Sequence, residues 1–118
     1  MIGRWHGLVI DCPDPRGLAK FYEKLLGMVR VQDEPGWVVI GDAPDRSGVA
    51  FARVEHWQPP KWPEESATMH FDVRVDDLGV AGEKVLALGA TRLEGGSDVF
   101  HVYADPAGHP FCLVSWQD

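Results

Sequence analysis

Residues 7–31 read GLVIDCPDPRGLAKFYEKLLGMVRV, and the same order of local signals returns at residues 70–93, HFDVRVDDLGVAGEKVLALGATRL. In both stretches an alternating run suits a strand, an aspartate can cap a helix, and a glycine can end that helix. The two capping residues, Asp14 and Asp77, stand at the same place in the repeat. The sequence therefore predicts one structural unit that occurs twice.

The two predicted helices have clear end signals. Asp14 suits the N-cap of the first helix and Gly27 its C-terminal stop, and the apolar residues between them are spaced for one helix face. The second helix is expected to begin at Asp76 or Asp77 and to end at Gly89. Both helices should therefore pack one apolar face against the strands of their own unit.

Each predicted helix is followed by three runs that suit strands: MVRVQ, GWVVIGD and GVAFARV in the first half, and ATRLEG, VFHVYAD and FCLVSW in the second. Between the halves, residues 55–66 (EHWQPPKWPEES) contain three prolines, through which a helix would not run. We therefore predict one α+β domain over residues 1–118, built from two βαβββ modules at 1–56 and 67–118. A linker at 57–66 would join them.

Composition excludes several classes of function. Hydrophobic residues make up 45% and charged residues 25% of 118 residues, as in ordinary soluble globular domains. The net charge is −7 and the 11 lysines and arginines do not cluster, which argues against nucleic acid binding. No apolar run suits a membrane span, and MIGRWHGLVI lacks a signal-peptide pattern. We expect no membrane partner and a cytoplasmic location, with Cys12 and Cys112 reduced.

Four segments, together with the repeat, carry a family resemblance: DPRGLAKFYEKLLGM (14–28), MHFDVRVDDL (69–78), LALGAT (86–91) and DPAGHPFCLV (105–114). They resemble the vicinal oxygen chelate superfamily, which includes glyoxalase I, extradiol dioxygenases, fosfomycin resistance proteins and bleomycin-binding proteins. PPKWP followed by MHFDV and HPFCLV is similar to uncharacterised glyoxalase-like proteins of actinobacteria. The resemblance implies cupped mixed sheets around a central cavity, a small-molecule ligand and a homodimer.

The resemblance also implies positions for metal ligands. Metal-dependent members use a histidine in the first strand of each module and a glutamate in the last strand. His70 matches the second histidine, Cys112 stands at the glutamate, and Gly7 stands at the first histidine. A fourth position falls within FARVE, on Ala52 by strand parity, although Glu55 is also available near the linker.

These positions predict a degenerate metal site. Loss of the carboxylate disfavours a hard ion such as Mg²⁺ or Mn²⁺, so no metal cofactor is expected. The alternative is a soft ion such as Zn²⁺ held by His70, Cys112 and His6. Adjacent strand residues point to opposite faces, so His6 could take part only if a bulge shifted the register.

His70 and Cys112 are the candidate catalytic residues, and the resemblance directs both toward one cavity. For Cys112 the alternative is a small buried apolar residue, and for His70 a hydrogen-bonded structural residue. The candidate ligand-binding residues are aromatic, and they could instead serve core packing or a dimer contact: Trp37, Phe51, Trp57, Trp62 and Phe100.

Three functions follow from these residues. The first is a small-molecule binding protein, or an enzyme that works without metal. The second is a metal-dependent lyase, isomerase or dioxygenase that uses His70 with Cys112 and His6. The third is an antibiotic-sequestering protein of the bleomycin-binding type, for which an acidic chain would suit a cationic drug. The residues alone do not decide whether the protein is an enzyme.

Overall fold

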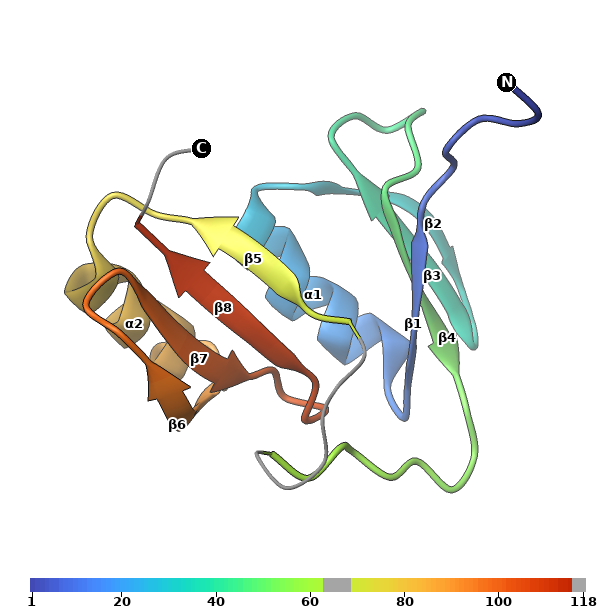
Figure 1. The fold of residues 1–118 in the computed structure, drawn as a ribbon. Helices are drawn as coiled ribbons and strands as arrows, with labels where there is room; N and C mark the ends of the chain where they lie inside the picture. Colours follow the sequence, from blue (N-terminus) through green and yellow to red (C-terminus); the bar gives the residue numbers. More distant parts are fainter. Residues whose placement is uncertain (63–68, 116–118) are drawn as a thin grey trace. The chain divides into compact units, whose positions relative to one another are not determined.

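The computed structural model describes residues 1–62 and 69–115, and Figure 1 shows their course. The end of the predicted linker, 63–66, and the first residues of the predicted second module, 67–68, lie outside these ranges. The elements follow in the order β1 (Leu8–Cys12), α1 (Pro15–Leu26), β2 (Val29–Glu34), β3 (Trp37–Gly41), β4 (Val49–Arg53), β5 (Phe71–Arg74), α2 (Leu78–Ala87), β6 (Thr91–Gly96), β7 (Phe100–Ala104) and β8 (Pro110–Val114). The predicted α+β class and the repeated βαβββ order are confirmed.

The strands form two four-stranded mixed sheets with the same topology, β1-β4-β3-β2 and β5-β8-β7-β6. In each sheet the first strand pairs in parallel with the last strand of its unit, and the other pairs are antiparallel. The chain divides into two compact units, Met1–Trp57 and Gln58–Asp118, which are called module one and module two and are described separately. The central cavity between them stays a prediction. No helix in the described part of the chain is long and apolar enough to cross a membrane.

Helix α1 begins and ends at the residues that the sequence predicts. The Asp14 side chain accepts a hydrogen bond from the Gly17 amide at 3.2 Å, which satisfies a free donor of the first turn. Gly27 ends the helix in the left-handed conformation, at φ 68°. Tyr22 on α1 and Phe51 on β4 are fully buried, and their rings stack 5.6 Å apart. This contact fixes α1 on one face of the first sheet.

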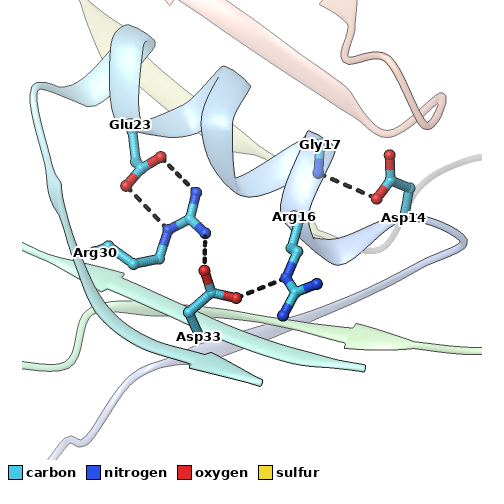
Figure 2. A network of polar contacts seen from close by, with 6 residues as sticks. All are labelled: Asp14, Arg16, Gly17, Glu23, Arg30 and Asp33. Carbon is cyan, nitrogen blue, oxygen red and sulfur yellow. Dashed lines mark hydrogen bonds and ion pairs between the residues drawn. The ribbon is translucent and has the colours of Figure 1, made fainter. Parts of the chain in front are cut away.

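A charged network also ties α1 to β2 in module one (Figure 2). The Arg30 guanidinium donates two hydrogen bonds to the Glu23 carboxylate, at 2.8 and 3.1 Å, and a third to Asp33 at 3.1 Å. Arg16 donates to the other Asp33 oxygen at 2.7 Å. The hydrogen bond from Arg16 is the main reason why the pKa of the Asp33 carboxyl is lowered.

This network predicts how stability depends on acid. Since the pKa of Asp33 is lowered by folding, its contribution is present above the ordinary aspartate pKa, about 3.9, and is lost as pH falls through the folded-state value. In urea unfolding followed below about pH 4, the free energy should fall less steeply with acid in Asp33→Asn than in wild type. Arg16→Met should give a slope between those of wild type and Asp33→Asn, because Arg30 still donates to Asp33. A wild-type slope in Asp33→Asn would contradict the assignment.

Helix α2 covers one face of the second sheet. Asp77 caps it by accepting from the Val80 amide at 3.0 Å, as the repeat predicts. Gly82 is buried on the side of α2 that meets the hydroxyl of Tyr103 on β7. The Tyr103 ring stacks on Phe111 of β8, with centroids 5.9 Å apart. The opposite side of this sheet is therefore free of α2, and it is called the β-face of module two.

Candidate functional site

A tight turn between β7 and β8 positions the last strand of module two. The Asp105 carboxylate is buried and accepts hydrogen bonds from the amides of Ala107 at 2.8 Å and His109 at 3.0 Å. It also lies 2.8 Å from Nδ1 of the His109 ring. Gly108 completes the turn at φ 100°, with Pro59 packed where a side chain would begin. This turn sets where β8, and with it Cys112, runs in the sheet.

Strand register brings three potential ligand groups onto the β-face. β5 and β8 pair in parallel, with Asp72 directly beside Cys112. His70 lies one residue before β5 and two before Asp72, so the two side chains share a side of the sheet. Nε2 of His70 is 3.2 Å from Oδ1 of Asp72. One ligand atom from each of the three residues lies within 4.8 Å of the other two.

The three groups differ in their surroundings. The His70 and Asp72 side chains are each 48% exposed, whereas Cys112 is 8% exposed. Burial, and to a lesser degree the negative charge of Asp72, raises the pKa of the Cys112 thiol. The free thiol is therefore protonated at neutral pH, and it lacks the lowered pKa that an activated nucleophile needs. The arrangement suits ligand binding better than attack by sulfur.

An apolar surface adjoins this polar group. Val102, Cys112 and Val114 form a buried cluster on the β-face, and three partly buried side chains pack against it: Trp62, Leu93 and Phe100. The Trp62 indole donates a hydrogen bond to the Glu94 carbonyl oxygen at 2.7 Å, which holds its ring beside β6. Aromatic and aliphatic groups next to a few polar ones are typical of surfaces that bind small molecules.

The five predicted aromatic residues separate into different places. Trp62 and Phe100 lie on the β-face beside Cys112. Trp37 belongs to β3, and by register it points away from α1, while Trp57 is half-buried at the end of module one. Phe51 has no exposed surface and stacks on α1, so the structure places it in the core and not at an accessible site. Ligand contact by the other four stays a prediction.

Module one does not supply the family's remaining metal ligands. A Cβ atom at Gly7 would lie 2.8 Å from the Gly48 carbonyl oxygen, so this position is closed to a histidine unless the backbone moves. β1 pairs with β4 in unbroken register from Leu8 to Cys12, so no bulge within β1 shifts His6, which precedes the strand. The residues present therefore do not fit a hard metal ion held in the family's usual way.

The fourth ligand position is corrected by the register. Val9 pairs with Ala50 in module one as Asp72 pairs with Cys112 in module two. The repeat therefore puts this position at Ala50 rather than Ala52, and neither alanine carries a ligand atom. Asp72, in contrast, was missed by sequence reasoning. Its alternation with His70 was the available signal, but its place beside Cys112 depends on a long-range pairing.

Comparison with known proteins agrees with this fold. The model of a family described as the glyoxalase-like domain matches residues 7–114. A glyoxalase/bleomycin resistance protein/dioxygenase family enzyme from Burkholderia phytofirmans PsJN has TM-score 0.71 at 14% identity, covering 93% of this chain and 96% of that chain. The fosfomycin resistance protein FosX from Mesorhizobium loti has TM-score 0.67 at 16% identity, covering 99% and 94%.

A mutant FosX from Listeria monocytogenes, complexed with Mn(II) and 1S,2S-dihydroxypropylphosphonic acid, has TM-score 0.73 at 13% identity, covering 99% of this chain and 93% of that chain. At such identities the solved structures establish the fold alone. No curated protein sequence matches the chain. From its repeated topology and the family match over residues 7–114, the chain belongs to the glyoxalase-like domain family, within the vicinal oxygen chelate superfamily.

Proposed function

We propose that this protein binds a small, largely apolar molecule on the β-face of module two. The proposal rests on one observation: on the sheet face that α2 does not cover, an apolar cluster lies next to the polar side chains of His70 and Asp72. Phe100 and Trp62 would contact the apolar part of the molecule, and His70 and Asp72 would anchor a polar group. Such a ligand needs only one or two hydrogen-bonding groups to fix its orientation.

Binding, rather than the chemistry of a hard metal ion, agrees best with the residues present. FosX of Listeria monocytogenes is complexed with Mn(II), whereas this chain has glycine and alanine at two of the family's ligand positions. The protonated thiol of Cys112 adds apolar surface to the cluster and no negative charge. A neutral or cationic ligand is favoured, since the net charge of −7 repels anions at long range.

The proposal predicts saturable binding of the neutral fluorescent probe N-phenyl-1-naphthylamine. Its fluorescence should rise on titration into the protein and saturate near one probe per chain. Leu93→Ser, which removes an apolar contact on the β-face, should weaken binding about tenfold, equivalent to roughly 1.4 kcal/mol. Leu86→Ser is the matched control, because Leu86 is 47% exposed on α2, and it should bind the probe as wild type does.

Absence of saturable binding, or equal weakening in both leucine variants, would contradict this function. Circular dichroism of both variants shows whether each retains its fold, so that a lost signal is not caused by unfolding.

A second candidate function is a metal-assisted lyase, isomerase or dioxygenase. It is favoured by Asp72, which lies beside His70 and Cys112 and supplies a third ligand group in place of His6.

For either function we propose a homodimer, because the edge strands of both sheets have no hydrogen-bonded neighbour on their outer side in the described chain. Light scattering that gives a dimer mass would support this state, and a monomer mass at micromolar concentration would contradict it.

A further inference from the structure

We infer that His70, Asp72 and Cys112 form a site for a thiophilic divalent cation, with Zn²⁺ as the best fit, held by module two alone. His70, directly before β5, offers an imidazole nitrogen, and Asp72 on β5 offers a carboxylate oxygen. Cys112 on β8 offers a thiol sulfur. Each is an established type of zinc ligand, and catalytic zinc sites often use three protein ligands with a fourth position open. The cation differs in class from a hard ion bound by carboxylates.

The distances allow such a site after small side-chain movements. In a tetrahedral zinc site the ligand atoms lie about 3.3–3.7 Å apart, given metal–ligand bonds of about 2.0–2.3 Å. Nε2 of His70 and Oδ1 of Asp72 are already 3.2 Å apart, and all three ligand atoms lie within 4.8 Å of one another. Because the His70 and Asp72 side chains are half exposed, rotation can draw them toward the sulfur without disturbing the core.

Asp72 is the residue that favours a cation site over a purely structural role for Cys112 in the apolar cluster. A cysteine and a histidine alone would be too few ligands, and Cys112 could then be read as a member of the apolar cluster only. Asp72 faces both, in register with Cys112 and beside His70, so it adds the third ligand and a compensating negative charge. On binding, the thiol proton passes to solvent and the thiolate coordinates the cation.

The ligand set also predicts which cation is selected. Thiolate and imidazole favour Zn²⁺ and Co²⁺, whereas Mn²⁺ and Mg²⁺ favour oxygen ligands in octahedral geometry. One carboxylate is present among the three groups. We therefore expect Zn²⁺ to bind far more tightly than Mn²⁺, and by a wider margin than at a site made of carboxylates alone, where the general order of divalent affinities already places Zn²⁺ above Mn²⁺.

The test uses the tag-free chain of residues 1–118, freed of metal by a chelator that is then removed by dialysis. Calorimetric titration should show about one Zn²⁺ per chain, bound at roughly micromolar concentration or tighter, and Mn²⁺ at least about 100-fold weaker. Co²⁺ should produce the near-ultraviolet absorption band of a cobalt–thiolate bond. This band reports directly on coordination by the Cys112 sulfur, because Cys12 is fully buried in module one.

Variants then assign the ligands. Asp72→Asn should weaken Zn²⁺ binding at least about tenfold, and Cys112→Ala should remove the cobalt band. Asp76→Asn is the matched control, because Asp76 is exposed outside the cluster, and it should leave both measurements unchanged. Asp72 is half exposed, so its replacement keeps the fold and provides a decisive result even if Cys112→Ala fails to fold.

No Zn²⁺ binding, Mn²⁺ binding as tight as Zn²⁺, or wild-type affinity in Asp72→Asn would each overturn the cation site. The result is separable from the apolar ligand, because Leu93→Ser, which should weaken binding of N-phenyl-1-naphthylamine, should still bind Zn²⁺ as wild type does.

Discussion

Replacing Asp105 with alanine should lower the free energy of unfolding by about 3 kcal/mol. The carboxylate is buried in the turn before β8, where it accepts hydrogen bonds from the amides of Ala107 and His109. Its loss removes the charged acceptor of two hydrogen bonds at half-buried residues, and hydrogen bonds to a charged group contribute about 1.5–3 kcal/mol. The Nδ1 atom of the His109 ring, 2.8 Å from the carboxylate, loses its contact as well.

Urea unfolding followed by circular dichroism measures this change. Asp98→Ala removes an exposed aspartate from the neighbouring turn and should change the free energy by less than about 0.5 kcal/mol. Asp105→Asn keeps one carbonyl acceptor, so its free energy of unfolding should lie between those of Asp105→Ala and Asp98→Ala. Equal unfolding curves for Asp105→Ala and Asp98→Ala would show that the buried carboxylate does not hold the turn.

Replacing Gly41 with alanine should destabilise the protein by about 3 kcal/mol, the upper end for an overpacked site. Gly41 is buried at the end of β3, where the chain from Arg46 to Gly48 folds back over it. A Cβ atom at Gly41 would overlap the Arg46 carbonyl oxygen, and a backbone atom cannot rotate away as a side chain can. The Gly48 amide, which donates to the Ile40 carbonyl oxygen at 2.9 Å, would shift with it.

Thermal unfolding provides the measurement, with Gly3→Ala as the control. A Cβ atom at Gly3 meets no atom within 4 Å, so this substitution should have little effect. A Gly41→Ala variant that melts at the wild-type temperature would contradict the close backbone contact.

Local chemistry explains why so much of the fold could be predicted from the sequence. The caps at Asp14 and Asp77 and the stop at Gly27 depend on residues within one helical turn, so their signals are complete in a short window. The alternation of apolar and polar residues that indicates a strand is likewise visible in each half of the sequence. The repeat then doubles the information, because two copies of one pattern support the same order of elements.

The candidate site could be predicted only in part, because it depends on pairing between distant strands. His70 and Cys112 were identified through family motifs, but Asp72 joins them through the parallel register of β5 and β8. Without this pairing, strand parity alone predicts the fourth ligand position at Ala52, whereas the register of β1 and β4 gives Ala50. Burial of Phe51 against Tyr22 was equally hidden, since an aromatic residue in a strand suits either a core or a ligand surface.

Titration of the ¹⁵N-labelled protein with N-phenyl-1-naphthylamine tests whether the ligand binds on the β-face of module two. We expect the largest amide shift changes in ¹H–¹⁵N correlation spectra on this face, at Leu93, Phe100, Val102, Cys112 and Val114. Changes confined to α2 or to module one, or no changes at saturating probe, would contradict it.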